Sequence, residues 1–350
     1  MTIKLATLYS VGIAVSLLFV SGCMVNPVTL EQQFNVISED REINIGRQAH
    51  PEIIKQFGYY QNPDLQRYVN EIGQKLVTVC KRRDITYHFT VIDTPIENAF
   101  AVPGGYIYIT RGLLAYLNSE AELAGVLAHE IGHIVGRDSA NQISQAMLAQ
   151  IAALAGVAAG SASKGDAAAA TSLLLNSVML GFGREKEYLA DAQGVEYMYK
   201  AGYDPMQMAS FQRSLSQISQ SPIGLQQYNM THPNIFDRID QCTARAKVMM
   251  AMNTAMSQIN NQDTAVNKIQ NNSGIQVLSE KYKEYLEGLA YGPKENLRHI
   301  KIYTTMEGDT LSLIAKKTLG NELKAKELAE LNGIPPEMQL VAGSKIKTIF

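Results

Sequence analysis

Apolar residues recur every three or four positions along three stretches in the first half of the chain. These stretches are residues 39–57, 64–81 and 121–136, and this period places apolar side chains on one face of a helix. Ser119, followed three residues later by Glu122, forms a candidate capping box at the start of the third stretch. We therefore predict three amphipathic helices here.

Two shorter stretches alternate apolar and polar residues, which is the period of a β-strand. They are residues 85–92 and 105–110, and Pro103, Gly104 and Gly105 mark a turn at the start of the second. Helical stretches predominate along the rest of the chain. The predicted fold class is therefore α+β, mainly helical, with a small β-sheet.

Residues 141–182 are apolar and rich in alanine, in two segments on either side of the polar residues 161–166. Each segment approaches the length that spans a bilayer, but Gln142, Gln145 and Asn176 interrupt them. We predict a helical hairpin that packs on the rest of the protein or shields its cleft. A hairpin that touches the membrane is the alternative, and a spanning pair is disfavoured.

The second half of the chain ends in a separate unit. Residues 252–275 are polar and rich in Asn and Gln, which predicts a surface helix leading into a linker, and residues 278–289 form a further helical stretch. Residues 301–350 then read as strand, helix, helix and strand. Thr310 is a cap for the first of these helices, and Asn332-Gly333 ends the second.

The N-terminus carries a targeting pattern. Residues 11–20 form an apolar core that is short for a permanent membrane anchor, and Val20-Ser21-Gly22-Cys23 follows it. Small residues directly before a cysteine resemble the lipobox of bacterial lipoproteins. The resemblance implies cleavage before Cys23, lipid on its sulfur and, because residue 24 is Met, an outer-membrane location. An uncleaved anchor or a plain secretory signal is the alternative.

Composition narrows the class of protein only a little. The 350 residues are 46% hydrophobic and 18% charged, with a formal net charge of −2 and no basic run, so no nucleic-acid partner is expected. Besides Cys23, the chain holds Cys80 and Cys242. In an exported protein this pair suits a disulfide, although two buried free thiols fit equally well.

The chemistry lies in the pentapeptide His129-Glu130-Ile131-Gly132-His133, inside the third predicted helix. Two histidines four residues apart share one helix face and can both reach one tetrahedral Zn²⁺. Glu130 then lies beside the open fourth position as a general base. A chance coincidence is the alternative, since the chain holds six histidines.

A catalytic zinc usually takes three protein ligands, and the stretch from Arg184 to Asp191 offers carboxylates for the third. Glu187 and Asp191 lie four apart on one helical face, which suits one ligand and one carboxylate that accepts a hydrogen bond from a ligand histidine. Glu185 is the rival ligand. It lies about 200° around the helix from Glu187, so only one of them can face the metal.

With these residues in that order, the chain resembles zinc metallopeptidase family M48, which includes the CAAX prenyl protease. Two further stretches agree: residues 98–105, similar to the family's edge strand, and Thr231-His232-Pro233 with Arg238 behind it. The resemblance covers roughly residues 35–250. The family often has an Arg-His pair shortly after the second ligand histidine, where this chain has Arg137-Asp138.

The resemblance implies a role for each matching residue. It makes His129, His133 and Glu187 the ligands of one Zn²⁺, Glu130 the general base and Asp191 the residue that orients a ligand histidine. It places His232 and Arg238 near the cleft, to stabilise the oxyanion or gate the metal. The expected substrate-binding edge strand includes Asn98, Ala99, Gly104 and Gly105.

The C-terminal unit resembles a LysM domain, a module that binds glycans containing N-acetylglucosamine, chiefly peptidoglycan. The resemblance places the glycan groove between two loops, with the expected contacts Gly308, Asp309, Thr310, Leu311, Gly333 and Ile334. A small packing domain without glycan affinity is the alternative.

The expected protein is a lipid-anchored zinc endopeptidase of the bacterial cell envelope, at the outer membrane facing the periplasm. From the family we expect unfolded or misassembled envelope proteins as substrates, and peptidoglycan as a partner. A chaperone-like assembly factor with a latent zinc site is the rival, and a wall-tethering scaffold with an inactive peptidase is a third. The predicted divisions are a signal peptide at 1–22, a lead segment at 23–34, a peptidase domain at 35–250, a helical and polar linker at 251–299 and the LysM domain at 300–350.

Overall fold

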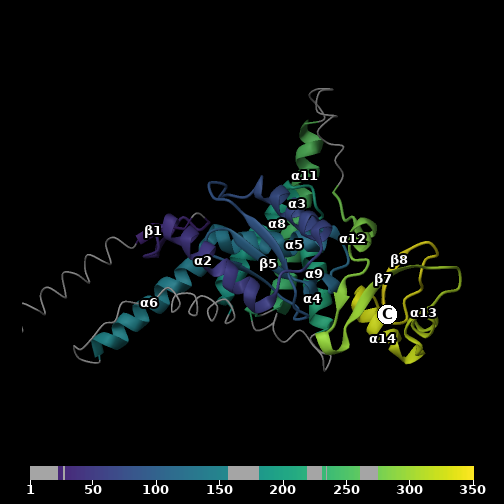
Figure 1. Cartoon of the computed structure of the whole chain (residues 1–350). Coiled ribbons are helices and arrows are strands. Elements are labelled where there is room, and N and C mark those ends of the chain that lie inside the picture. Colours follow the sequence, from purple (N-terminus) through teal and green to yellow (C-terminus); the bar gives the residue numbers. More distant parts are fainter. Residues whose placement is uncertain (1–22, 27, 157–180, 219–230, 234, 261–274) are drawn as a thin grey trace, which may run out of the picture.

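The computed structural model describes residues 23–26, 28–156, 181–218, 231–233, 235–260 and 275–350, and helices predominate in them (Figure 1). The predicted α+β class, mainly helical, is confirmed. In chain order the elements are β1 (Cys23–Val25), β2 (Gln32–Phe34), α2 (Glu39–Phe57), α3 (Pro63–Val77), β3 (His88–Ile92), β4 (Ala99–Val102), β5 (Tyr106–Thr110), α4 (Arg111–Tyr116), α5 (Glu120–Gly136), α6 (Asp138–Gly156), α8 (Arg184–Lys200), α9 (Met206–Ile218), α11 (Ile235–Asn260), α12 (Ser279–Tyr285), β6 (Ala290–Tyr291), η1 (Lys294–Asn296), β7 (Arg298–Thr304), α13 (Leu311–Leu319), η2 (Glu322–Lys324), α14 (Ala325–Asn332) and β8 (Lys345–Ile349).

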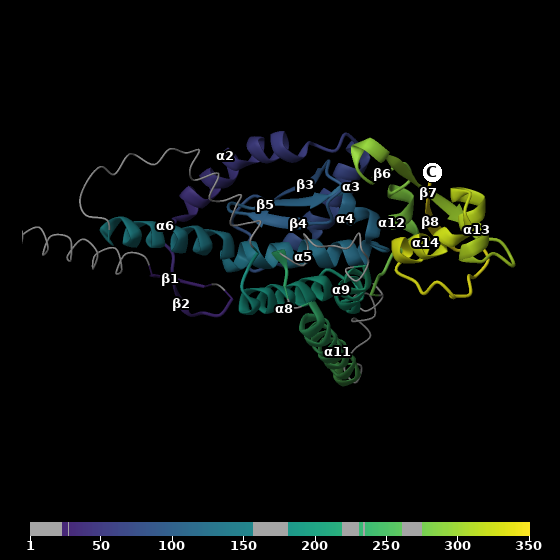
Figure 2. The same cartoon turned by 90° about the horizontal axis from the view of Figure 1, so that it is seen from below.

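A three-stranded sheet lies at the centre of residues 35–260, which we call the main body. Its strand order is β3-β5-β4, with β3 parallel and β4 antiparallel to β5, so β4 is an edge strand. Helix α2 covers one face of the sheet, and α5 runs beneath the other (Figure 2). All four side chains of β4 are therefore buried, which explains why this strand shows no alternation of apolar and polar residues.

Helix α5 is the centre of the core, and each of its residues is buried. Helix α8 packs closely along it because two positions lack a side chain. A Cβ at Gly132 of α5 would lie 2.9 Å from Ala190 Cα. A Cβ at Gly194 of α8 would lie 3.2 Å from the backbone nitrogen of His129. This close approach allows α8 to bring short side chains to the histidines of α5.

The C-terminal module, residues 290–350, docks against the main body at the opposite end of the molecule from β1 (Figure 1). Its sheet has the order β6-β7-β8, so β6 adds a strand from the segment that was predicted to be a linker. Lys347 of β8 is fully buried, and its Nζ donates to Ala115 O at 2.6 Å and to Leu117 O at 2.7 Å. The module thus caps the end of α4 in the main body.

The apolar stretches are partly described. Helix α6 forms the first half of the hairpin predicted at 141–182, whereas residues 157–180 and the predicted signal peptide at 1–22 lie outside the described residues. Cys23 lies in the short antiparallel pair of β1 and β2, within the predicted lead segment. No described helix combines the length and the apolar character that a membrane crossing requires.

The two cysteines of the main body, Cys80 and Cys242, are free thiols, so of the two alternatives that the sequence left open the structure has the free thiols. Cys80 Sγ lies 3.2 Å from Arg82 O, and burial raises its pKa. Cys242 is on α11, where burial raises its pKa well above the usual value. Each thiol is buried in its own part of the core, and neither is reactive there.

Candidate active site

Helix α5 supplies the two histidines and the glutamate of the pentapeptide from one rigid element. Its start is fixed by Ser119, whose Oγ accepts from Glu122 N at 3.0 Å. Glu122 Oε2 accepts in return from Asn118 N at 2.6 Å, so the reciprocal bond of the predicted capping box goes to the residue before the cap. The helix ends at Gly136, after which Arg137 takes a left-handed conformation with φ 56°.

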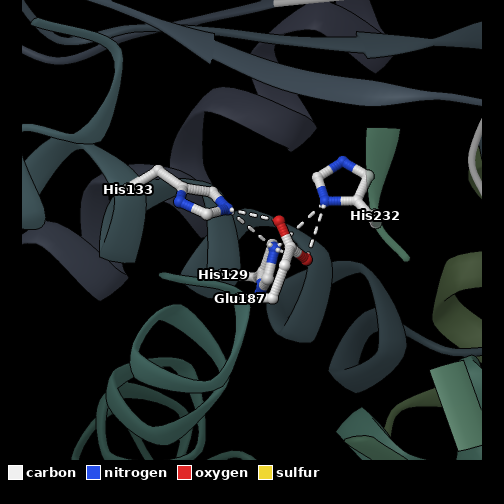
Figure 3. Close-up of side chains that lie close together, drawn as sticks. All are labelled: His129, His133, Glu187 and His232. Atoms are coloured by element: carbon white, nitrogen blue, oxygen red, sulfur yellow. Dashed lines mark hydrogen bonds and ion pairs between the residues drawn. The ribbon is translucent and has the colours of Figure 1, made fainter. Parts of the chain in front are cut away.

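Four buried side chains converge on one point (Figure 3). Nε2 of His129 lies 3.1 Å from His133 Nε2, 3.3 Å from His232 Nδ1 and 3.4 Å from Glu187 Oε2. Glu187 also lies 3.4 Å from His133 Nε2 and 3.2 Å from His232 Nδ1. The two histidines of α5, the glutamate of α8 and a histidine from the segment before α11 thus form one cluster.

The chemistry of this cluster fits a metal ion. Ligand atoms about 2.0–2.1 Å from a tetrahedral centre lie about 3.3 Å from one another, which matches the separations in the cluster. Glu187 Oε1 is buried and has no hydrogen-bond partner among the described residues. Three imidazoles and one carboxylate are a ligand set that suits a divalent transition metal, zinc among them.

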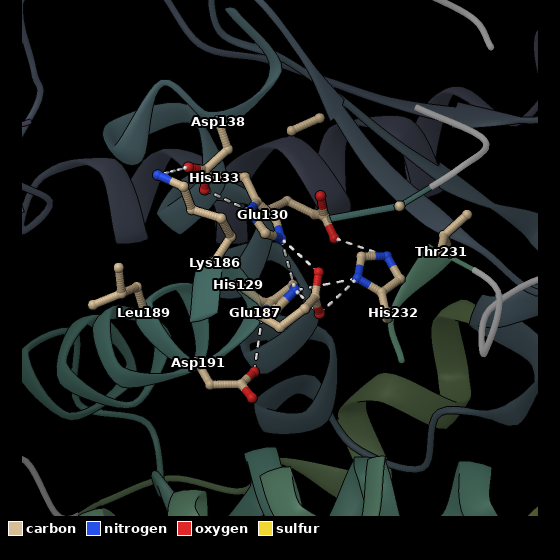
Figure 4. Close-up of polar contacts among 12 residues, drawn as sticks. His129, Glu130, His133, Asp138, Lys186, Glu187, Leu189, Asp191, Thr231 and His232 are labelled. Atoms are coloured by element: carbon tan, nitrogen blue, oxygen red, sulfur yellow. Dashed lines mark hydrogen bonds and ion pairs between the residues drawn. The ribbon is translucent and has the colours of Figure 1, made fainter. Parts of the chain in front are cut away.

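Both histidines of α5 are held through their other nitrogen by a carboxylate (Figure 4). Asp191 Oδ1 lies 2.8 Å from His129 Nδ1, and Asp138 Oδ2 lies 2.9 Å from His133 Nδ1. Such contacts fix the tautomer of each ring and leave Nε2 free to bind a metal. Sequence reasoning missed Asp138, although its place directly after the end of the histidine helix was a usable signal.

Arg238 of α11 joins the two carboxylates of α8. It donates from Nε to Asp191 Oδ2 at 2.7 Å and from Nη2 to Asp191 Oδ1 at 2.8 Å, while Nη1 lies 2.7 Å from Glu187 Oε2. Burial alone would raise the pKa of each carboxyl, but Arg238 and the neighbouring histidines hold both pKa values well below the usual range. Both groups therefore stay ionised in a buried site.

Glu130 lies beside the cluster without belonging to it. Both of its carboxylate oxygens are buried, and neither has a hydrogen-bond partner among the described residues. His232 Nε2 lies 3.8 Å from Glu130 Oε1. A buried carboxylate with unsatisfied oxygens is costly, so its position next to a metal-type cluster points to chemistry rather than to stability.

The site is closed to solvent. The four clustered side chains and Glu130 are each at most 2% exposed. Phe182 packs over His133 with ring centroids 4.2 Å apart. A Cβ at Gly181 would lie 2.1 Å from Thr231 O, so the residue before Phe182 fits against the segment that carries His232 only because it is glycine.

The edge strand predicted to bind substrate lies against the cluster, and side chains already contact two of its carbonyl groups, those of Ala99 and Ala101. His232 Nε2 lies 3.2 Å from Ala99 O, and Ser139 Oγ donates to Ala101 O at 3.1 Å. Asn98 Oδ1 accepts from Thr231 Oγ1 at 3.2 Å. Gly104 and Gly105, both with positive φ, form the turn between β4 and β5, away from the cluster.

The other predicted residues fall in two places. Glu185 is exposed, so Glu187 alone of the two rival ligands is in the cluster. In the C-terminal module, Asp309 accepts from Met306 N and Tyr303 O–H, and Leu311 is in the core, so both hold the loop together from inside. The remaining predicted glycan contacts are Gly308, which is exposed, Thr310, which caps α13, Gly333, which faces Asn118 and Ser214 of the main body, and Ile334, which is half-buried.

Comparison with known proteins agrees with this geometry. Residues 63–246 match the family model for peptidase family M48, and residues 303–348 match the LysM domain. The chain is 32% identical over 183 residues to the mitochondrial metalloendopeptidase OMA1 of Schizosaccharomyces pombe, covering 51% of this chain and 53% of the relative. It is 30% identical over 198 residues to the β-barrel assembly-enhancing protease of Escherichia coli, covering 55% and 41%.

A third relative, the β-barrel assembly-enhancing protease of Yersinia pestis, is 30% identical over 204 residues, covering 56% of this chain and 42% of the relative. The chain thus spans about half the length of these curated relatives or less. The family match itself covers just over half of this chain, and the clustered residues all lie inside it. The protein therefore belongs to peptidase family M48 and carries a C-terminal LysM domain.

Proposed function

We propose that the protein is an endopeptidase that uses one zinc ion, with Glu130 as its general base. One observation carries the proposal: four buried ligand groups converge within 4.8 Å, and beside them lies the Glu130 carboxylate, which has no hydrogen-bond partner among the described residues. His129, His133 and Glu187 would hold the ion. Asp138, Asp191 and Arg238 would keep these three ligands in place.

When bound, zinc supplies a Lewis acid that lowers the pKa of a water molecule and polarises the scissile carbonyl. Glu130 accepts the proton of the attacking water and returns it to the leaving amine. The edge strand β4 offers backbone groups with which an extended substrate can pair. Arg238 already forms three contacts with Asp191 and Glu187, so in our proposal it positions a ligand rather than contacting substrate.

We further propose that the described conformation is a resting one, in which His232 would be the fourth ligand of a bound metal ion. A catalytic metal site keeps one position open for water, whereas a site with four protein ligands is closed. His232 also contacts Ala99 O of the edge strand at 3.2 Å. Withdrawal of this one side chain would therefore free the water position and an edge-strand carbonyl together.

The test compares casein cleavage by the zinc-loaded chain and its His232→Ala variant, each with and without a chelator. We expect the variant to cleave about tenfold faster, because in it no histidine side chain competes with water for the remaining ligand position of the metal. A loss of activity would instead assign His232 to stabilisation of the oxyanion, the other role that we considered. His88→Ala, a change at an exposed histidine on β3, is the matched control and should behave like the unmodified chain.

The resting conformation also bears on the rival function, a chaperone-like assembly factor with a latent site. Such a factor would bind zinc and unfolded protein but would not cleave casein, even as His232→Ala. Chelator-sensitive cleavage by that variant would exclude the rival. Cleavage by neither form would favour it.

The cellular setting that we propose is the bacterial outer membrane facing the periplasm, with lipid on Cys23. The substrates would be unfolded or misassembled envelope proteins, a proposal that the names of the β-barrel assembly-enhancing relatives support. Metabolic labelling with palmitate should mark the chain and not Cys23→Ser. Labelling of both would place the lipid elsewhere.

We also propose that the LysM domain holds peptidoglycan. Because Lys347 is buried against the main body, the full chain rather than the isolated domain is the right reagent. Purified peptidoglycan should retain the chain, and soluble oligomers of N-acetylglucosamine should release it. A chain that passes through without retention would exclude this role.

A further inference from the structure

A cleft of about 720 Å³ opens where the C-terminal module meets the main body. We call it the junction cleft. The main body contributes Glu97 and Tyr116, and the module contributes Tyr291 of strand β6 together with Arg298, Lys324 and Glu330. It is therefore a composite of segments far apart in the chain, and it lies outside the metal cluster and outside the predicted glycan loops.

Of the three glutamates that line the junction cleft, two have an ion-pair partner and Glu97 has none among the described residues. Arg298 Nη2 donates to Glu327 Oε1 at 2.7 Å, and Lys326 Nζ lies 3.9 Å from Glu330 Oε1. Glu97 has no ion-pair partner within 4.0 Å among the described residues. It is half-buried, and burial raises its pKa to about 6.

Two tyrosines lie close to this carboxyl. Their hydroxyls are 3.0 Å apart, and the rings meet edge to face with centroids separated by 6.1 Å. The charge of Glu97 contributes to the raised pKa of both Tyr116 and Tyr291, after burial as the main cause. A desolvated carboxylate next to aromatic rings is an environment that attracts an ammonium group.

We propose that the junction cleft binds the amino end of a peptide, with Glu97 as the acceptor for its ammonium group. Lys324, which the module contributes to the lining of the same cleft, would meet a peptide carbonyl of the same ligand. The cleft has the volume of a small-ligand site, which is enough for the first few residues of a chain. An endopeptidase creates such an amino end with each cut, so the reaction proposed above would itself supply the ligand.

The position of Glu97 connects this site to His232. The next residue, Asn98, accepts from Thr231 Oγ1 at 3.2 Å, and the one after it, Ala99, has its carbonyl 3.2 Å from His232 Nε2. A ligand that draws Glu97 into the cleft therefore acts on two groups that contact the segment of His232. Occupation should favour withdrawal of His232, and this part of the inference rests on the proposed function.

Binding is tested on the full chain carrying Glu130→Gln, so that the probe cannot be cleaved. Isothermal titration calorimetry compares tetraalanine amide that has a free amino end with its N-acetylated form. We expect the free form to bind about tenfold more tightly, because only it offers a charge-assisted hydrogen bond to Glu97. This comparison needs no change at Glu97 and does not depend on metal or on cleavage.

A second set of variants locates the contact. Glu97→Gln should remove the preference for the free form, whereas Glu295→Gln, a change at an exposed residue near the cleft, should retain it. Equal affinity for both peptides, no saturable binding, or a preference that survives Glu97→Gln would each overturn the site.

The link to His232 has its own readout. In the zinc-loaded chain, the free peptide should raise casein cleavage about fivefold, and the acetylated peptide should not. The chain carrying His232→Ala should show no such rise, since it has nothing left to release. Binding without any change in cleavage by an active enzyme would overturn the link while leaving both the site and the proposed endopeptidase in place.

Discussion

Two regions of this molecule bury ionisable side chains, and they differ in how completely these side chains are hydrogen-bonded. At the cluster of His129, His133, Glu187 and His232, both Glu187 and the neighbouring Glu130 keep oxygens without a hydrogen-bond partner among the described residues. At the junction of the module with the main body, Lys347 donates to two carbonyls, and Glu122 accepts from Asn118 N and Ser210 Oγ. The carboxylates of the first region have spare acceptor oxygens, whereas Lys347 and Glu122 in the second are hydrogen-bonded.

The difference separates a reactive site from a structural contact. A buried polar group without a partner costs free energy, so its persistence needs a reason such as a metal or a proton transfer. A buried charge whose partners are complete instead fixes one arrangement of the parts around it. By this criterion the cluster should respond to change mainly in activity and metal affinity, and the junction mainly in stability.

The largest expected effect is in the cluster. Glu130→Gln should lower casein cleavage about a thousandfold, because the amide cannot accept the proton of the attacking water. Zinc content should stay at one ion per chain, measured by atomic emission. Cleavage at the unmodified rate would remove Glu130 from its role.

The junction should lose stability rather than activity. Lys347→Met leaves the buried Ala115 and Leu117 carbonyls without this donor, so the free energy of unfolding should fall by about 3 kcal/mol. Urea denaturation measures this. Lys301→Met, on the exposed face of β7, should change it by less than about 0.5 kcal/mol. Equal losses in both variants would contradict the structural role.

A third change tests whether the carboxylate that contacts His129 contributes to metal binding. Asp191→Asn removes the charge that orients His129 and pairs with Arg238, so zinc affinity should fall about 10–100-fold. Competition against a chromophoric chelator gives this affinity. Asp240→Asn, at an exposed aspartate on α11, provides the control and should leave the affinity unchanged.

The smallest effect concerns Glu97, the one acid lining the junction cleft that has no ion pair among the described residues. Its pKa is about 6 in the folded chain, above the ordinary 4.5, so the folded state holds the extra proton between these values and stability falls as pH rises through them. Glu97→Gln should match the unmodified chain at pH 4.5 and exceed its stability by at most about 2 kcal/mol at pH 7.5. Thermal melts at the two pH values measure the difference, and an equal gain at both would disprove the shift.

The sequence indicated that His129 and His133 share one helix face, because the helical period places residues four apart together. That Glu187 joins them was implied by the family resemblance, and the structure places its carboxylate 3.4 Å from both histidines. Asp138 escaped because its contact with His133 depends on a left-handed turn at Arg137, and no periodicity reports such a turn. That His232 lies within reach of the metal ligands depends on how the segment before α11 packs, which spacing does not reveal.

The fold was predicted in the same uneven way. Strand β4 carries no alternation because both of its faces are buried, so only the family resemblance indicated it. The linker predicted at 251–299 was too long, since β6 pairs with β7 and belongs to the module's sheet. Lys347 looks like any surface lysine in the sequence, and only the docking of β8 on α4 explains its burial.

The placement of Lys347 also has a consequence for the order in which the protein is made. The carbonyls that it caps belong to α4, yet residue 347 follows the entire peptidase sequence and is synthesised after it. A chain still being synthesised therefore holds an incompletely capped main body until β8 has emerged. The main body would reach its full stability only when the LysM domain is also present.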